Sequence, residues 1–155
     1  MKAQSQNPLF KIAEIRVSYQ PKFKASERPK VTQSSDAYKV LISNWDRDML
    51  QLCEQCYIML LNQANQVIGM REISRGGFAM AIVDPKIVFS IALKGCACAL
   101  VIAHSHPSGS LKPSEADFKM TARMVEAGKL LDLVVLDHLI VTKNGYFSFG
   151  DEGLI

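Results

Sequence analysis

Three apolar runs dominate the hydrophobic pattern of the chain. Residues 57–61, 97–103 and 133–141 are almost continuously hydrophobic. Runs of this length without polar alternation are typical of strands that are buried on both faces of a sheet. Segments with helical periodicity lie between them. The pattern therefore predicts an α/β fold, a three-layer α/β/α domain built on a mixed β-sheet.

Short polar stretches next to the first and last runs predict two hairpins. Residues 62–65 separate the first run from a further one over 66–72, which predicts a pair of neighbouring antiparallel strands. Asn144-Gly145 is a strong turn signal, and it leads into the segment 146–149.

Three helices are predicted, each with a recognisable start. Ser35 is the expected N-cap of the first helix. Asp84-Pro85 supplies an N-cap and a first helical residue for the second, which Gly95 ends. Ser114 opens the third, which closes at Gly128. The residues expected to face the core are Tyr38, Leu41, Ile42 and Trp45, then Val88, Ile91 and Ala92, then Phe118, Ala122 and Val125.

The length of 155 residues predicts one folded domain. We expect it to occupy residues 34–155, after an N-terminal arm over residues 1–33. Within the arm, partial alternation over 11–19 predicts an edge strand, and the polar segment 21–30 predicts a loop. Residues 74–77 predict a flexible turn.

Composition and charge narrow the classes of partner. Hydrophobic residues make up 48% of the chain, which is enough for a core, yet no apolar run is long enough to span a membrane. The N-terminus lacks an apolar signal segment, so we expect a cytoplasmic location. Residues 1–50 hold nine Lys/Arg and five Asp/Glu, against nine and ten in the remainder. This weak basic bias would suit an acidic partner such as nucleic acid, but a solvated loop explains it more simply.

The four cysteines occur as Cys53-x-x-Cys56 and Cys96-x-Cys98. A metal site formed by all four is disfavoured because the second pair lacks the usual spacing. Small buried hydrophobic residues are the preferred interpretation, and disulfides are not expected without a secretion signal.

The strongest chemical signal follows the second apolar run. His104 and His106 are two residues apart, and Pro107 favours extended backbone at His106, so the two imidazoles should point the same way. Asp117 follows eleven residues after His106. Two histidines and one carboxylate suit zinc and leave a fourth position for water, as in catalytic sites. The same set also suits non-haem iron.

Each candidate also has a structural explanation. Ser114 and Asp117 have the spacing of a capping box at a helix start. A His-x-His pair alone arises often by chance. Glu54, just before the first apolar run, is the candidate general base, but composition alone favours an exposed carboxylate at a strand end.

Taken together, these motifs resemble a known family. The string His104-Ser105-His106-Pro107 with Ser114-x-x-Asp117 and the upstream Glu54 resembles the JAMM (MPN+) metalloproteases. Residues 103–109, 113–117 and 136–141 are similar to the bacterial RadC-type branch. The resemblance covers roughly residues 45–155 and implies the JAB/MPN, cytidine-deaminase-like fold.

The resemblance implies a zinc-dependent metallopeptidase or isopeptidase acting on a peptide or protein substrate. His104, His106 and Asp117 would bind one zinc ion per chain. Glu54 would be the general base that activates the zinc-bound water, and Ser114 would hold that water or stabilise the oxyanion. Residues 74–80 and 108–112 are the loops expected to flank the substrate groove.

His138 belongs to a Leu136-Asp137-His138 motif that the RadC-type branch shares. Because the metal already has three protein ligands, we expect His138 to orient a ligand, with Asp137, rather than to bind the metal.

Two features depart from the family pattern. RadC-type proteins usually carry an N-terminal helix-hairpin-helix region associated with DNA, and residues 1–33 do not resemble it. Ser105 stands where the bacterial branch commonly has Asn. The alternative hypothesis is a non-enzymatic metal-binding accessory module in DNA repair or mobile-element metabolism. A zinc deaminase is disfavoured because its His-x-Glu and Pro-Cys-x-x-Cys signatures are missing.

Overall fold

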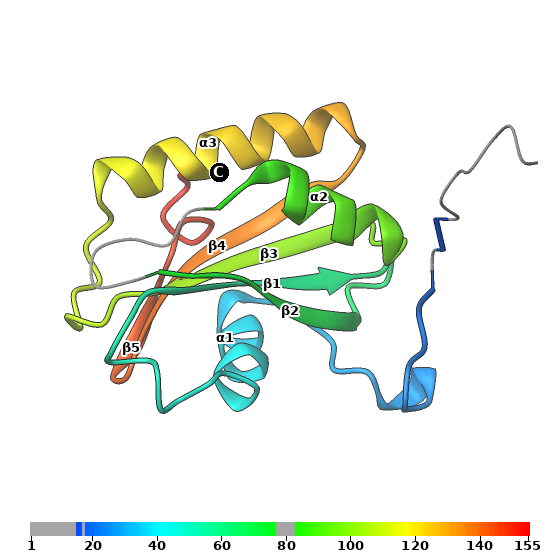
Figure 1. The fold of residues 1–155 in the computed structure, drawn as a ribbon, viewed down its shortest axis with the longest axis horizontal. Helices are drawn as coiled ribbons and strands as arrows, with labels where there is room; N and C mark the ends of the chain where they lie inside the picture. Colours follow the sequence, from blue (N-terminus) through cyan, green and yellow to red (C-terminus); the bar gives the residue numbers. More distant parts are fainter. Residues whose placement is uncertain (1–14, 17, 77–82) are drawn as a thin grey trace, which may run out of the picture.

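The computed structural model describes residues 15–16, 18–76 and 83–155, which contain a five-stranded sheet with helices on both faces (Figure 1). None of the helices in these ranges combines the length and apolar character that a membrane span requires. The strands are β1 (Gln55–Leu61), β2 (Val67–Arg75), β3 (Ala99–Ser105), β4 (Val134–Thr142) and β5 (Gly145–Ser148). The helices are α1 (Ser34–Ser43), α2 (Pro85–Lys94) and α3 (Glu115–Leu130), and a 3-10 turn, η1 (Ala25–Glu27), precedes them.

The sheet is mixed, as predicted. Its strand order is β2-β1-β3-β4-β5. Only the central pair β3 and β4 is parallel among these neighbours, and the other pairs are antiparallel. A parallel pair needs a crossover connection, which α3 supplies. This crossover returns the chain over one face of the sheet, so the start of α3 lies near the carboxyl end of β3 (Figure 1).

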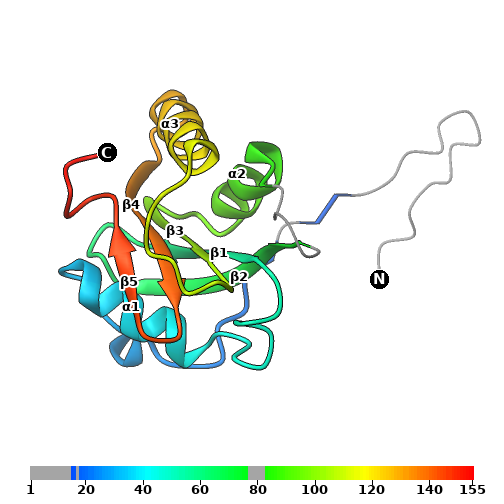
Figure 2. The same ribbon diagram turned by 90° about the vertical axis from the view of Figure 1, so that its left-hand side faces the viewer.

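The layers are those of an α/β/α sandwich. Helix α1 covers one face of the sheet, while α2 and α3 lie side by side on the other (Figures 1 and 2). Successive side chains of a strand point to opposite faces. Met59 of β1 therefore packs with Leu41 of α1, whereas Ile58 packs with Val88 of α2 and Met124 of α3. Every residue of β1 and β3 is buried, which confirms that these apolar runs are double-faced strands.

Most predicted turns and caps are confirmed. The carboxylate of Asp84 accepts the backbone N–H of Lys86 at 2.9 Å, Pro85 is the first residue of α2, and Gly95 is its C-cap. Strands β1 and β2 form one hairpin, and β4 and β5 form the other. The predicted turn over 74–77 is wrong for residues 74 and 75, which belong to β2, and residue 77 lies outside the described residues.

The start of α1 differs from the prediction. Gln33, not Ser35, is the N-cap, and its side chain makes no capping hydrogen bond. The carboxylate of Asp36, in the first turn of α1, instead holds the residue that precedes the N-cap. It accepts the backbone N–H of Thr32 at 3.0 Å and the Thr32 hydroxyl at 2.7 Å.

The buried face of α3 was predicted one residue out of phase. Phe118 and Ala122 are exposed, and Val125 is only partly buried. The residues that face the sheet are Asp117, Thr121, Met124 and Gly128. Two of these four residues are polar, so the apolar pattern of the sequence pointed to the neighbouring face that contains Phe118.

The described end of the N-terminal arm contacts the sheet. The backbone N–H of Val31 donates to the carbonyl of Asn65 at 2.9 Å, and that of Val67 donates to the carbonyl of Pro29 at 2.8 Å. Val31 itself is buried in the cluster beneath α1. The predicted edge strand over 11–19 lies mostly outside the described residues, and its described positions, 15, 16, 18 and 19, are not in a strand. The predicted loop over 21–30 contains the short turn η1.

Gly128 permits a close approach between α3 and the segment that follows it. A Cβ at this position would lie 2.4 Å from the carbonyl oxygen of Leu133. We expect Gly128→Ala to lower the free energy of unfolding by about 1–3 kcal/mol, because the backbone must shift to relieve the overlap. Urea denaturation would measure it. Gly69→Ala is the control, since a Cβ there meets nothing within 4 Å. Equal effects of the two substitutions would contradict this packing.

Candidate metal centre

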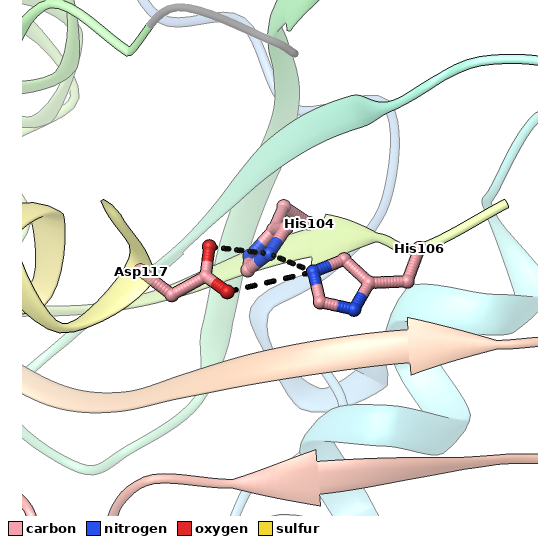
Figure 3. Close-up of side chains that lie close together, drawn as sticks. All are labelled: His104, His106 and Asp117. Carbon is pink, nitrogen blue, oxygen red and sulfur yellow. Dashed lines mark hydrogen bonds and ion pairs between the residues drawn. The ribbon is translucent and has the colours of Figure 1, made fainter. Parts of the chain in front are cut away.

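Two histidines and one aspartate meet where β3 ends and α3 begins. His104 is the last residue but one of β3, and His106 directly follows the strand. Asp117 lies in the first turn of α3. Figure 3 shows the carboxylate of Asp117 pointing at both rings. His104 is 4% exposed and Asp117 is 8% exposed, so the cluster is largely shielded from bulk water.

The potential ligand atoms are close together. His104 Nε2 lies 3.0 Å from His106 Nε2. Asp117 Oδ1 is 3.1 Å from His104 Nε2, and Asp117 Oδ2 is 3.5 Å from His106 Nε2. Within the described parts of the chain, these three side chains are the one group of three or more His, Cys, Asp or Glu residues placed to hold a metal ion.

The hydrogen bond of His106 Nδ1 determines the protonation of Nε2 in the same ring. His106 Nδ1 is 2.8 Å from the carbonyl oxygen of Ser110. A carbonyl oxygen only accepts, so Nδ1 carries the hydrogen and donates it. In the neutral ring, Nε2 therefore presents a lone pair to the cluster.

A longer chain of hydrogen bonds determines the tautomer of His104. The hydroxyl of Thr121 donates to the backbone carbonyl of Asp117 at 2.7 Å. Having given up its one proton, this hydroxyl accepts from His138 Nδ1, 2.6 Å away. His138 Nε2 is then an acceptor for His104 Nδ1 at 2.8 Å. His104 Nε2 is consequently the ring atom with a free lone pair, and it faces Asp117.

This arrangement calls for a cation. Two nitrogen lone pairs and a carboxylate converge with no hydrogen-bond donor between them. Tetrahedral metal–nitrogen bonds of about 2.0–2.1 Å place neighbouring ligand atoms roughly 3.3 Å apart. The observed Nε2–Nε2 separation of 3.0 Å is close to that spacing. The donor set therefore fits a divalent metal with three protein ligands.

The pKa shifts agree with a cation at this point. Where no cation is bound, a proton on either ring can take its place and donate to Asp117. Burial acts to raise the pKa of Asp117, but such hydrogen bonds from His104 and His106 prevail and hold it well below its usual range. Contact with Asp117 raises the pKa of His106. Burial lowers the pKa of His138 well below the usual histidine value, so His138 stays neutral, as the hydrogen-bond chain requires.

Asp117 is placed for two roles at once. Its Oδ2 accepts the backbone N–H of Ser114 at 2.7 Å, while its own N–H donates to Ser114 Oγ at 3.2 Å. These two bonds form the capping box of α3. Because Oδ1 faces His104, the structural and the metal-binding explanations of this carboxylate hold together.

Glu54 and Ser114 lie in the same cavity as the three potential ligands. This cavity has a volume of about 850 Å³, within the usual range for ligand pockets. The sheet register explains the position of Glu54. Cys56 pairs with His104 in the antiparallel β1–β3 ladder, so Glu54, two residues earlier, is brought level with His106. The structure thus brings together all five residues that the motif singled out.

Ser105 has a contact that the sequence analysis did not foresee. It is fully buried. Its hydroxyl accepts the backbone N–H of Gln55 at 2.9 Å and lies 3.3 Å from the carbonyl of Cys53, to which it donates. The residue between the two histidines therefore holds both peptide groups that flank Glu54.

Thr121 was also missed, and Asp137 acts differently from the expectation. Thr121 orients His138, and its signal in the sequence is the four-residue spacing from Asp117, one turn of helix. Asp137 accepts from the backbone of His138 and Gly150 and from the Ser148 hydroxyl, at 2.6–2.8 Å. It secures the segment after β5, whereas the His138 ring itself contacts His104.

The cysteines do not form a second cluster of this kind among the described residues. Cys53 and Cys56 are buried, as small hydrophobic residues would be, while Cys98 is partly buried and Cys96 is exposed. Burial raises the pKa of the Cys56 thiol to about 12, so it remains protonated.

Comparison with known proteins agrees with the motif. Residues 31–154 match the family described as the RadC-like JAB domain. The chain is 40% identical over 128 residues to a "UPF0758 protein" of Flavobacterium johnsoniae, covering 81% of this chain and 53% of that protein. It is 39% identical over 136 residues to a "UPF0758 protein" of Porphyromonas gingivalis, covering 87% and 59% respectively.

The chain thus spans about half the length of the curated relatives it matches. The family match, by contrast, covers nearly all of the described sheet and helices and includes each of the five motif residues. On this evidence the chain belongs to the RadC-like JAB domain family.

Proposed function

We propose that this domain is a zinc-dependent hydrolase of peptide or isopeptide bonds. One observation carries the proposal. The convergent lone pairs of His104 and His106 and the carboxylate of Asp117 lie in a cavity that also holds Glu54 and Ser114. A metal-binding module would need only the first three residues. A hydrolase also needs a proton acceptor and an oxyanion donor.

Zinc fits this donor set better than iron. Two imidazoles and a carboxylate are common to zinc hydrolases and non-haem iron oxygenases. An oxygenase would have no need of a carboxylate base and a hydroxyl beside the metal. The hydrogen bonds between Thr121 and His138 and between His138 and His104 orient a candidate ligand histidine, as hydrogen bonds behind the ligands commonly do in zinc sites.

The residues suggest how the reaction proceeds. A zinc ion, when bound, supplies the Lewis acidity that brings the pKa of a ligating water to about 7. Glu54 accepts a proton from the attacking water and delivers it to the nitrogen of the leaving amine. Ser114 Oγ accepts the N–H of Asp117, so its own O–H remains able to donate to the developing oxyanion.

Metal content tests the first part of the proposal. We expect about one zinc ion per chain by mass spectrometry, and loss of that zinc in His106→Ala and Asp117→Asn. Asp117→Asn is chosen because its amide oxygen can still accept the N–H of Ser114 and keep the helix cap. Wild-type protein that holds no stoichiometric zinc, even after reconstitution, would refute the metal site.

Removal of the base tests the second part. We expect Glu54→Gln to keep its zinc but to lower kcat by at least about 100-fold on any peptide that the wild type cleaves, because proton transfer is lost. A zinc-loaded variant that retains full function would instead favour a non-enzymatic accessory module.

The hydrogen-bond chain behind His104 predicts a change in metal affinity. Thr121→Val removes the hydroxyl that orients His138, so we expect zinc affinity to fall about 10–100-fold in competition with a chelating indicator. Thr142→Val is a matched control. Both threonines are 2% exposed and donate to a backbone carbonyl, but the Thr142 hydroxyl contacts Gly145 and makes no hydrogen bond with His138. Equal losses of zinc affinity in the two variants would argue against a role of the Thr121–His138–His104 hydrogen bonds.

A further inference from the structure

The cavity at the metal centre continues along α3 as a groove. Its α3 lining includes Ala116, Lys119, Met120 and Arg123. These positions recur every three or four residues and so form one stripe along the helix. The stripe lies beside the buried face that carries Asp117. At 1.5 Å per residue, it runs for about 10 Å from the first turn of α3.

The groove has an excess of positive charge. Lys119 and Arg123 line it from α3, and Lys112 lines it from the loop before the helix. Its only lining carboxylates among the described residues are Glu54 and Asp117, both of which belong to the metal centre. A divalent metal ion would add further positive charge.

No side chain in the described parts of the chain neutralises these cations. All three side chains are exposed. None of them takes part in an ion pair or a side-chain hydrogen bond within the described parts of the chain, although α3 carries Glu115 and Glu126 within one turn of Lys119 and Arg123. Charges left in this state beside a reaction centre attract and orient an oppositely charged substrate.

We propose that the groove binds an acidic peptide segment, with Asp or Glu within about three residues of the scissile bond; this rests on the hydrolase function proposed above. The spacing sets that range. Lys119 and Arg123 are two and six positions beyond Asp117, or about 3 and 9 Å along the helix. An extended peptide advances about 3.3 Å per residue, so these cations meet side chains one to three residues from the metal.

The remaining lining suits a neighbouring aliphatic side chain. Met120 of α3 lines the groove together with Val83, and both are partly buried. Methionine side chains are flexible and adapt to differently shaped apolar groups. The groove therefore combines an apolar wall with a row of cations, which fits a segment that alternates apolar and acidic residues.

A peptide fits the groove better than a single-stranded nucleic acid. Proteins that bind single strands pair a long basic track with aromatic side chains on which bases stack. No Phe, Tyr or Trp lines this groove in the described part of the chain. The net charge of the whole chain is only +3, and residues 51–155 carry nine Lys/Arg against ten Asp/Glu.

The test measures binding separately from turnover. The zinc-loaded Glu54→Gln chain is titrated by fluorescence anisotropy against two pools of fluorescein-labelled ten-residue peptides. The pools are identical except that positions one to three residues from the centre carry Glu in one and Gln in the other. We expect the Glu pool to bind about five- to tenfold more tightly at low salt, and the difference to shrink at high salt.

Charge reversal identifies the residues responsible. Lys119→Glu combined with Arg123→Glu, in the same Glu54→Gln chain, should abolish or invert the preference for the Glu pool. Lys129→Glu is the matched control, because Lys129 is an exposed cation of the same helix that does not line the groove. If the reversed variant does not fold, Lys119→Gln with Arg123→Gln should reduce the preference.

Several outcomes would overturn the inference: equal binding of the two pools, a preference that survives charge reversal, or tighter binding of a ten-nucleotide oligothymidine than of the Glu pool. The last would assign the cations to phosphates instead. Binding is measured without turnover, so the two proposals can fail separately. If the wild type cleaves no peptide but the Glu pool still binds more tightly, acidic-peptide binding is supported and the hydrolase function is refuted. Cleavage of peptides without any preference for the Glu pool would refute only the acidic-peptide proposal.

Discussion

The pairing of β3 with a strand on each side is the constraint on which the site depends. Its antiparallel register with β1 brings Glu54 level with His106. Its parallel register with β4 sets Ile102 beside His138 and so places the His138 ring next to His104. A slip of one residue in either ladder would turn these side chains to the opposite face of the sheet. The buried apolar runs fix the register, and the register fixes the chemistry.

Burying a polar chain inside this sheet has a cost that is met by complete hydrogen bonding. His138 is fully buried, and its two ring nitrogens have partners in Thr121 and His104. An unpaired polar group in such a place would cost about 1–3 kcal/mol. This chain of hydrogen bonds ends at the backbone carbonyl of Asp117. It therefore links the two potential ligands His104 and Asp117 on the side away from the metal position. The tautomer of His104 is thus set by the fold itself.

The sequence predicted the parts of the molecule that local rules govern. Double-faced strands, both hairpins and the Asp84-Pro85 helix start follow from runs and turn signals within a few residues. The clustering of His104, His106 and Asp117 was predictable because these residues are close in the sequence and Pro107 restrains the backbone after His106. The face of α3 was not readable, because Asp117 and Thr121 are buried for their hydrogen bonds rather than for apolar area. The position of Glu54 depended on a register between strands more than forty residues apart, and only the family resemblance pointed to it.

The double role of Asp117 couples the metal centre to the fold. Its Oδ2 closes the capping box that starts α3, and its Oδ1 faces His104. The loop between β3 and α3 is also tied to the site, since the carbonyl of Ser110 accepts from His106 Nδ1. The first turn of α3 and the ligand cluster must therefore form together. Metal binding would then stabilise this loop and the start of the helix, because ligands that converge only in the folded chain turn binding free energy into folding free energy.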